Sequence, residues 1–580
     1  MAKREDAQRP RQGPREELKR IVANLAKALR GSGLYAPIRR ERLRRLTRRP
    51  GAYPDWNALL SREADAWREA LAAPKTKRVL VATHIGLHFT ANAIDSLMAV
   101  ALTLRGAQVD VLLCDSALSA CMIAEYTLAP SVERYARMGP SVDFCDVCQS
   151  AGERLYAGTG INVIRLSQFL TDEDRRDARA FAASESEFAP SDPPKSPIHE
   201  HALAGALRFF GRASLPADKT SKAVYARYLG GAMESARASA RLLSTNTYDA
   251  IIAHHGVYVP QGLLAAEARE RRIRLSTWHV AYRAGRLIFQ DGDTYHRAMI
   301  DEPEAAWSIP LTPDQGKALD AYLAERVTGA SDWIAFQRSG RLTNDATVKA
   351  LGIDPALPVD ALFANVAWDA RLHYAASAYG DMRDWAIDTV RWFAARPDRQ
   401  LVIRCHPGEV MNNPRAQDRL DDAIRAAFPV LPANVRIVSP ESDLNSYSIA
   451  AISRGALIFN TKMGMELSAR GMPVVVAGDA WVRGKGFTRD ASSPESYLAL
   501  LGDPATFAVL TPAETERARQ YAWHFFFRRC IPVAALGERN RDGTMALKAD
   551  AVTLALPGRD PGLDVICEGV LNGSGFASCG

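Results

Sequence analysis

From residue 78 onward, short apolar runs alternate with longer stretches of helical periodicity. Arg78–Thr83 and Gln108–Cys114 are apolar runs, and Thr90–Arg105 between them has helical spacing. Two short buried strands joined by a helix are typical of a βαβ unit in a parallel sheet. The alternation continues with strands over 248–253 and 274–278 and helices over 223–244 and 261–271. The pattern predicts a first α/β domain over residues 76–310.

The alternation restarts at residue 359 and predicts a second domain over 359–510. Residues 311–358 are helical at first and then irregular, which predicts a helical linker. The predicted strands of the second domain are 360–366, 400–405, 434–438, 456–460 and 473–476, and its helices are 380–396, 415–427, 443–453, 463–470 and 494–501. The chain therefore predicts an α/β protein with two tandem Rossmann-like doubly wound domains, and a cleft between the carboxyl ends of their sheets.

Three further segments lie outside the alternation. Residues 172–200 are polar and end in a stretch rich in Pro and Ser, which predicts an irregular surface excursion. Residues 511–580 open with a helical, partly aromatic stretch that either crosses back to brace the first domain or packs as an ordinary core helix. Residues 1–75 are predicted to form a basic helical N-terminal extension.

The composition is that of a soluble globular protein, with 580 residues, 47% hydrophobic and 24% charged. The sequence shows neither an apolar run long enough to cross a bilayer nor a secretory signal. Its 8 cysteines lack the dense spacing of a secreted disulfide framework. We therefore expect a cytoplasmic protein.

The basic character is concentrated near the N-terminus, where residues 1–50 hold 16 basic against 5 acidic residues. Apolar residues recur there at helical spacing between Leu18 and Leu29, with basic residues around them. Residues 15–50 could lie on an anionic membrane surface, at the inner face of the cytoplasmic membrane. The alternatives are a solvated helix docked on the protein's own body and a frayed tail. No aromatic interleaving or reader motif accompanies the charge, so we expect no nucleic-acid partner.

The stretch LVIRCHPGE is the most informative of the chain. An apolar strand delivers Arg404, His406, Pro407 and Glu409 at its carboxyl end, where ligands bind in open α/β sheets. His can donate to a phosphate, and Arg can clamp one in two-pronged fashion. Both suit a nucleotide-sugar leaving group, although a single His after a strand also has a purely structural interpretation.

A second signal follows from Ser439 onward. The next strand ends near Thr461, and Gly464 opens a helix whose free N–H groups attract an anion. Glu466 in the first turn either caps the helix or accepts the hydroxyls of a ribose. The loop that begins at Gly478 is rich in Gly and could close on the ligand.

The stretches HPGE, SDLNSYSIAAISRGALIFNTKMGMELSARGMPVVVAGDAW and GKGFTRDASSPESY, within residues 360–500, resemble the capsule polysaccharide biosynthesis family, which includes Kdo-transferase-like GT-B glycosyltransferases. The resemblance implies that the HP dipeptide and a Ser/Thr-x-x-Gly-x-Glu helix start form the activated-sugar site. The usual Ser-Thr before the Gly is replaced here by Asn-Thr-Lys-Met. The resemblance therefore implicates as donor-binding residues His406, Pro407, Thr461, Gly464 and Glu466. It also places Asn365, Trp368 and Asp369 beside the donor phosphate or the reacting sugar.

The first domain should hold the acceptor and the base that an inverting transferase needs. Candidates are the histidines that follow two predicted strands: His84, His88, His254 and His255. Because neighbouring residues of a strand point to opposite sides, we expect at most one of His254 and His255 to face the cleft. His279 ends a further strand and could contact acceptor or donor.

Four cysteines lie close together in the sequence of the first domain: Cys114, Cys121, Cys145 and Cys148. Their spacing allows a structural zinc site, a redox pair or reduced cysteines that fill the core.

The sequence and the resemblance together predict a glycosyltransferase that needs no metal or other cofactor. It would move a sugar from a nucleotide-activated donor, CMP-Kdo-like or an NDP-sugar, to a cell-surface polysaccharide or glycolipid acceptor. The candidate catalytic residues are His406, Arg404, Glu409, His84, His254 and Asp369, and the candidate donor-binding residues are Asn365, Pro407, Ser439, Thr461, Gly464, Glu466 and Gly478. The alternatives are a polyol-phosphate transferase of the teichoic-acid type, a non-catalytic glycan assembly or export protein, and a nucleotide-sugar epimerase.

Overall fold

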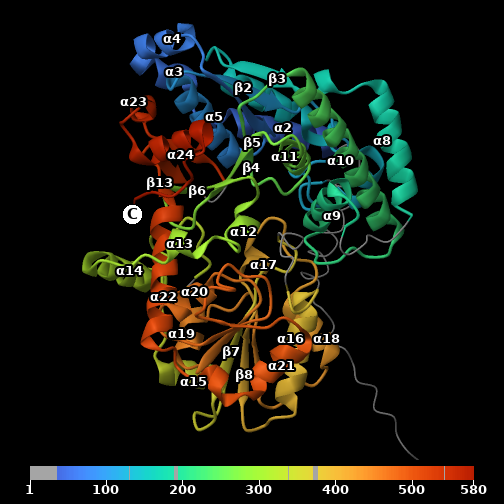
Figure 1. Cartoon of the computed structure of the whole chain (residues 1–580). Coiled ribbons are helices and arrows are strands. Elements are labelled where there is room, and N and C mark those ends of the chain that lie inside the picture. The colour runs from blue at the N-terminus through green and yellow to red at the C-terminus, as the bar shows by residue number, and fades with distance from the viewer. Residues whose placement is uncertain are drawn as a thin grey trace, which may run out of the picture.

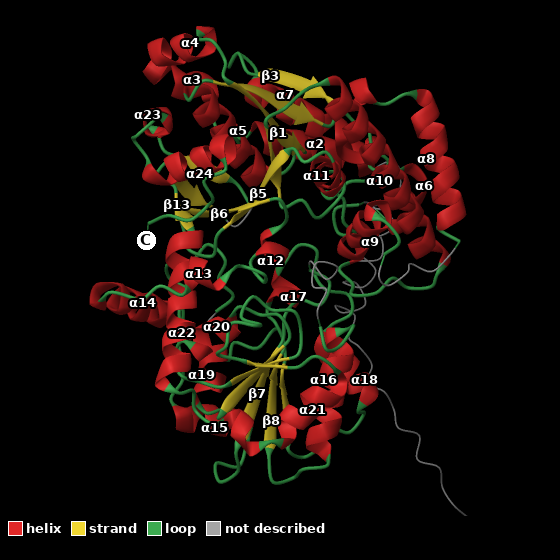
Figure 2. Cartoon of the chain, viewed as in Figure 1, coloured by secondary structure: helices red, strands yellow, loops and turns green. Residues whose placement is uncertain are grey.

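The computed structural model describes residues 35–129, 131–187, 194–337, 339–369, 377–540 and 543–579. These residues form two α/β domains, one above the other, and the C-terminal segment runs along the edge of both (Figure 1). Strands lie at the centre of each domain and helices lie around them (Figure 2).

The N-terminal domain is built on a seven-stranded sheet with the order β13-β6-β5-β4-β1-β2-β3. Strands β1 to β5 are parallel, whereas β6 pairs with β5 and β13 pairs with β6 in antiparallel fashion. The strands are β1 Lys77–His84, β2 Ala107–Leu113, β3 Asn162–Arg165, β4 Ala250–His254, β5 Arg274–Val280, β6 Arg286–Asp291 and β13 Ile531–Pro532.

Helices cover both faces of this sheet, so successive residues of β1 enter different apolar clusters. Val79 and Val81 pack with the helices of one face, and Leu80 and Ala82 pack with those of the other. The helices of the domain are α2 Tyr35–Arg48, α3 Trp56–Leu60, α4 Ala64–Ala72, α5 Phe89–Leu104, α6 Val132–Met138, α7 Asp146–Tyr156, α8 Asp172–Glu185, α9 Pro197–Phe210, α10 Lys219–Thr245 and α11 Gln261–Glu270.

The C-terminal domain is built on a six-stranded, fully parallel sheet with the order β12-β11-β10-β7-β8-β9. Its strands are β7 Val359–Phe363, β8 Gln400–Arg404, β9 Val435–Val438, β10 Gly455–Ile458, β11 Val474–Val476 and β12 Arg489–Asp490. Its helices are α16 Met382–Ala394, α17 Gly408–Met411, α18 Leu420–Ala427, α19 Ser446–Ala451, α20 Met463–Ser468 and α21 Pro494–Gly502.

Both sheets share one strand order, with the first strand at the centre and the chain reversing direction across it. This is the doubly wound Rossmann order, in which the crevice for a ligand lies at the reversal. In the N-terminal domain the reversal lies between β1 and β4, and in the C-terminal domain between β7 and β10. The predicted fold class, two tandem Rossmann-like domains, is confirmed.

A linker and one apolar cluster join the two domains. The linker contains α12 Tyr295–Ala298, α13 Glu304–Trp307, α14 Pro313–Glu325 and α15 Asn344–Leu351. Ala281 and Ile288 of the N-terminal domain belong to the same buried cluster as Ala361 and Ile458 of the C-terminal sheet. The domains therefore share part of their core.

The C-terminal segment crosses back from the second domain to the first. Helix α22 (Pro512–Trp523) continues as a π-helical stretch over His524–Arg529, after which β13 joins the N-terminal sheet. The hairpin β14 (Leu536–Arg539) and β15 (Met545–Leu547) follows, and then α23 (Ala551–Ala555) and α24 (Pro561–Asn572). Both of these last helices pack against α5.

One prediction about the peripheral segments needs revision, and several strands were not predicted. Residues 172–200 were expected to be irregular, but 172–185 form α8. A capping box between Thr171 and Asp174 and an acidic first turn start this helix, so the charges belong to a helix terminus rather than to a loop. The strands β3, β6, β12, β13, β14 and β15 were not predicted.

The described part of the basic extension lies on the N-terminal domain. Arg40 and Arg44 of α2 both pair with Asp146, and Leu43 packs against the core. The amphipathic helix predicted over Leu18–Leu29 lies outside the described residues. Within the described residues, the structure contains no helix that is both long and apolar enough to span a membrane.

Replacing Gly562 with Ala tests how tightly the C-terminal segment is docked. A Cβ atom at Gly562 would lie 1.6 Å from the backbone oxygen of Pro532, so α24 must move away from β13. We expect Gly562→Ala to lower the free energy of unfolding by about 1–3 kcal/mol in denaturant titrations. Gly502→Ala is the matched control, because a Cβ atom at Gly502 would meet nothing within 4 Å. Equal stabilities of the two variants would contradict the tight docking.

Candidate functional site

A cavity of about 370 Å³ lies between the two domains. It is bordered by the loops that follow β4 and β5 in the N-terminal domain and β7, β8 and β10 in the C-terminal domain. The cavity thus lies at the carboxyl edge and at the strand reversal of the C-terminal sheet. The lining residues that carry polar groups include His255, Tyr258, His279, His296, Asn365, Asp369, His406, Asn460, Thr461 and Lys462.

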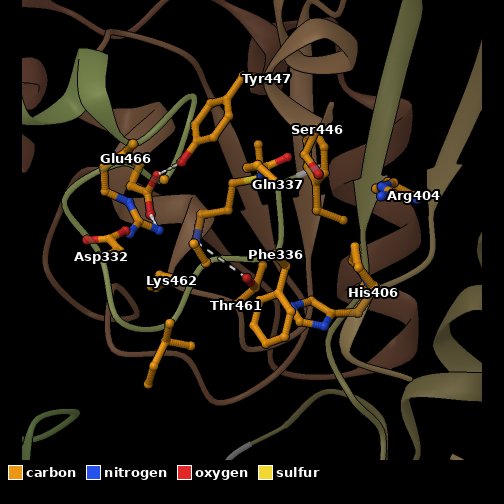
Figure 3. A pocket seen from close by; sticks show the side chains of 18 residues that line it. Asp332, Phe336, Gln337, Arg404, His406, Ser446, Tyr447, Thr461, Lys462 and Glu466 are labelled. Atoms are coloured by element: carbon orange, nitrogen blue, oxygen red, sulfur yellow. Dashed lines mark hydrogen bonds and ion pairs between the residues drawn. The ribbon is translucent and has the colours of Figure 1, made fainter. Parts of the chain in front are cut away.

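A smaller cavity of about 60 Å³ shares His406, Thr461 and Lys462 with the large one. Figure 3 shows these side chains together with Phe336 of the linker, whose ring lies beside that of His406. The two ring centroids are 4.8 Å apart in an edge-to-face arrangement. The linker therefore forms part of the wall between the two cavities.

His406 is held as a neutral hydrogen-bond donor. Its Nδ1 accepts the backbone N–H of Gly408 at 3.0 Å, which leaves the ring proton on Nε2. Burial, followed by the charges of Lys462 and Arg404, lowers the pKa of His406 to about 3. The ring that borders both cavities thus offers one N–H group and no charge.

Lys462 supplies the positive charge of this edge. It precedes α20, and its ammonium nitrogen lies 4.3 Å from the ring centroid of Tyr282. Burial and Arg326 lower the pKa of Lys462 to about 8, so the side chain is mostly charged at neutral pH. Lys462 was not among the predicted site residues; its signal was the turn Asn-Thr-Lys-Met, which departs from the pattern of the resembled family.

Glu466 is tied to side chains of its own chain. Its carboxylate pairs with Arg326 of the linker at 2.9 Å. It also accepts a hydrogen bond from Tyr447, which a dashed line marks in Figure 3. Burial would raise its pKa, but Arg326 and Lys462 hold the pKa of Glu466 below the usual value. Glu466 borders the small cavity. Its carboxylate was predicted to hold a ribose, but it already pairs with Arg326.

Arg404 is likewise engaged by the protein. Its guanidinium donates to the backbone oxygens of Ser439 and Ser442 at 2.6 and 3.1 Å. Arg404 borders the small cavity, as does Pro407, whereas Ser439 takes part through its backbone carbonyl. Arg404 thus holds the loop after β9 in place through these two hydrogen bonds.

Gly464 and Gly478 permit close packing around β10 rather than lining either cavity. A Cβ atom at Gly464 would lie 2.5 Å from Cδ1 of Ile458, and one at Gly478 would lie 2.4 Å from the backbone oxygen of Phe459. The loop that begins at Gly478 is anchored as well, because the buried Lys485 donates to two backbone oxygens of the linker, those of Ile300 and Glu302.

Glu409 points away from the cleft. It lines neither cavity, and its Oε1 accepts the backbone N–H of Leu420 at the start of α18. Burial, reinforced by Asp421, raises the pKa of Glu409 to about 8. The carboxyl group is therefore protonated at neutral pH and holds α18 against α17.

Asp369 and Asn365 do line the large cavity. Asp369 accepts a hydrogen bond from Tyr258 of the N-terminal domain at 3.4 Å, and burial raises its pKa. Asn365 donates to the side-chain oxygen of Asn460 at 3.0 Å, which couples the loops after β7 and β10. Trp368, the third residue of this predicted group, is buried but does not line the cavity.

The structure brings only some of the candidate histidines of the N-terminal domain to the cavity, and one of the pair His254 and His255 faces it, as expected. His84 is fully buried, its Nδ1 lies 3.0 Å from the backbone oxygen of Ala82, and its ring faces the cysteines rather than the cleft. His254 is buried behind His255, and only His255 of this pair lines the large cavity. His279 and His296, which end β5 and begin α12, line it too.

The four cysteines line one small pocket of about 20 Å³ with His84. Burial raises the pKa of Cys114 to about 12, so this thiol is protonated at neutral pH. Among the described residues, the potential metal ligands that gather in a group of three are His254, His255 and His279, not these cysteines.

Comparison with known proteins finds no matching family model and no matching curated protein. Solved structures that resemble this chain include the KpsC beta Kdo 2,4 transferase of Thermosulfurimonas dismutans, with a TM-score of 0.32, 16% identity and coverage of 53% of this chain and 87% of that chain. A UDP-GlcNAc 2-epimerase from Neisseria meningitidis gives a TM-score of 0.26 and 10% identity over 77% of this chain and 97% of that chain. A glycotransferase of kitacinnamycin gives a TM-score of 0.21 and 13% identity over 77% of this chain and 96% of that chain. At such TM-scores these likenesses decide neither reaction nor ligand.

The raised pKa of Glu409 predicts a pH-dependent stability. The folded state keeps the proton up to about pH 8, whereas the ordinary pKa of a glutamate side chain is 4.5. Between these values the folded state binds more protons, so the free energy of unfolding falls as pH rises. Glu409→Gln has no such proton to lose.

We expect Glu409→Gln to gain stability relative to the wild type between pH 5 and pH 8, by more than about 1 kcal/mol, in denaturant titrations at each pH. Glu495→Gln, at a surface helix terminus, serves as the control. Parallel pH profiles of wild type and Glu409→Gln would show that Glu409 is ionised in the folded protein.

Arg326→Met tests the ion pairs below the small cavity. The Arg326 side chain is 7% exposed, and its partners Glu466 and Asp332 are each 1% exposed. Its loss leaves two buried carboxylates without their cation, so we expect a loss of about 3–5 kcal/mol in the free energy of unfolding. The control is Lys317→Met, which removes a surface pair with Asp314 and should cost less than about 1 kcal/mol. If both variants lowered the free energy of unfolding by similar amounts, the buried ion pairs of Arg326 would not be needed for stability.

Proposed function

We propose that the protein is a glycosyltransferase that moves a sugar from a nucleotide-activated donor to a polysaccharide or glycolipid acceptor. The donor would be a CMP-Kdo-like or NDP-sugar. The observation that carries the proposal is the placement of His406, Thr461 and Lys462 on one wall of the interdomain cavity. They follow β8 and β10, beside the strand reversal where doubly wound domains bind nucleotides.

The chemistry of this wall suits a departing nucleotide phosphate. The Nε2 proton of His406 can donate to a phosphate oxygen, and the Lys462 ammonium can balance the negative charge that develops on it. Thr461 adds a hydroxyl between them. Because His406 is fixed by Gly408 and flanked by Phe336, it needs no reorganisation to act as a donor.

In this proposal, Arg404 and Glu466 position other parts of the protein and do not bind the phosphate directly. Arg404 holds the backbone at Ser439 and Ser442, and Glu466 holds Arg326 and Tyr447. Both therefore shape the small cavity next to His406. A ribose could reach Glu466 only alongside Arg326, so the nucleoside would meet an ion pair rather than a free carboxylate.

The part of the cavity where Asp369 of the C-terminal domain meets Tyr258 of the N-terminal domain suits the acceptor. Asp369 lies in the cavity next to Tyr258, and its raised pKa makes it a better proton acceptor than a solvent-exposed carboxylate. We assign to Asp369 the removal of the proton from the attacking hydroxyl. The new glycosidic bond forms as the bond to the nucleotide phosphate breaks.

A thermal-shift screen with CMP, CDP, UDP, GDP and their sugar conjugates tests the donor site. We expect one nucleotide class to raise the Tm of the wild type, because a ligand that binds only the folded state stabilises it. In His406→Ala the shift should shrink, and turnover with the matching sugar donor should fall by about 100-fold or more. His199→Ala, whose imidazole pairs with Glu185 away from the cavity, should behave as the wild type.

The products separate the proposal from its alternatives. A glycosidic bond with release of the nucleotide supports the transferase. Phosphate retained on the product would indicate a polyol-phosphate transferase, and conversion of the donor sugar without acceptor would indicate an epimerase. Full turnover in His406→Ala would remove His406 from the mechanism, and the absence of any nucleotide shift would favour a non-catalytic glycan-binding role.

A further inference from the structure

Five histidines from β4, β5 and the segments after β1, β4 and β6 lie near one another, and three of them converge. One ring nitrogen from each of His254, His255 and His279 lies within 4.8 Å of the other two. The five are connected through ring contacts or charge coupling: His88, His254, His255, His279 and His296. A donor-site function in the C-terminal domain does not account for this cluster.

The backbone brings two adjacent histidines together. His255 has a φ of +44°, a left-handed conformation that is rare for a residue other than Gly. This conformation ends the alternation of the strand, and the rings of His254 and His255 meet at a centroid distance of 3.8 Å. Strain of this kind is held by the surrounding structure and occurs mainly at functional sites.

Two of the rings are prepared to act as ligands. The Nδ1 of His279 lies 2.7 Å from the backbone oxygen of Val280, so Nδ1 carries the proton and Nε2 keeps its lone pair. Such an outer hydrogen bond commonly orients metal-binding histidines. His254 is 4% exposed, and its Nδ1 has no hydrogen-bond partner. A buried nitrogen without a partner is costly, and a bound cation would satisfy it.

We propose that His254, His255 and His279 bind a divalent transition-metal ion of the zinc class, with open coordination positions directed toward the cavity between the domains. Imidazole nitrogens suit Zn²⁺, Co²⁺ and Ni²⁺, whereas Mg²⁺ and Ca²⁺ prefer oxygen ligands, which this set lacks. Three protein ligands with a free position are typical of zinc sites that bind a substrate or water. Zn–N bonds are about 2.0–2.1 Å long, so the three rings would turn to bring their nitrogens closer together around the ion.

The surroundings of the site favour an anionic fourth ligand. Histidines bind metal ions as neutral imidazoles, so the three ligands leave the charge of the ion uncompensated. Arg539 lines the same cavity and adds a further positive charge. His255 and His279 border the cavity while His254 lies behind them, so the open positions face the substrate space. An oxygen of a carboxylate or phosphate group on the substrate would complete the coordination.

Cobalt binding tests the site without reference to activity. The full chain is stripped with a chelator and titrated with Co²⁺, whose visible absorption reports nitrogen-rich tetrahedral coordination, and Zn²⁺ is then added in competition. We expect one equivalent of Co²⁺ per chain, displaced by Zn²⁺, with no thiolate-to-cobalt charge-transfer band. His255→Gln and His279→Gln should each weaken the binding by at least about tenfold.

His296→Gln is the matched control, because His296 lines the same cavity but lies outside the set of three. It should bind Co²⁺ as the wild type does. Far-ultraviolet circular dichroism and Tm show which variants are folded, and the two single variants on separate strands serve as independent tests. The proposal is overturned if the wild type binds no stoichiometric Co²⁺, if both variants bind it as tightly as the wild type, or if a thiolate band assigns the ion to the cysteines.

Discussion

The buried ion pairs of Arg326 are the constraint on which the site depends. Arg326 ends the long linker helix α14 and pairs with both Glu466 and Asp332. An arginine and two carboxylates are costly to bury, so each is stable there only while the others stay in place. Asn445 strengthens the same junction by donating to the backbone oxygens of Val327 and Ser339. The linker is thereby fixed on the C-terminal domain, and its residue Phe336 is held against His406.

Fixing the linker makes the cleft a preformed site. The two domains share a buried cluster, α22 continues into a strand of the first sheet, and Lys485 ties the loop after β11 to the linker. Each of these contacts would have to break if the domains were to separate widely. Specificity in such a site comes from groups that are already in place, which lowers the entropic cost of binding.

The sequence predicts the central parallel strands of both sheets because they are short buried runs between helices, whereas β3, β6, β12 and β13 were not predicted. It also brings His406, Thr461, Asn365 and Asp369 to one edge, because parallel strands end together. The sequence does not predict the direction in which individual side chains point. Glu409 follows the same strand as His406 but turns to α18, and the contact of His254 with His255 depends on one unusual backbone angle. The partner of Glu466 comes from the linker, and nothing local in the sequence indicates it.

The two walls of the cleft present different chemical groups, and each wall suits a different part of the proposed reaction. The C-terminal wall combines a neutral N–H donor at His406 with the charge of Lys462, which suits a phosphate that gains negative charge as it departs. The N-terminal wall presents a set of neutral imidazoles, since burial keeps protons off His255 and His279. These imidazoles carry no charge of their own, although Arg539 also lines the cavity, and they can accept protons or coordinate an ion. In the proposed function the donor therefore occupies the C-terminal wall, and the group that receives the sugar lies between Asp369 of that wall and Tyr258 of the N-terminal domain.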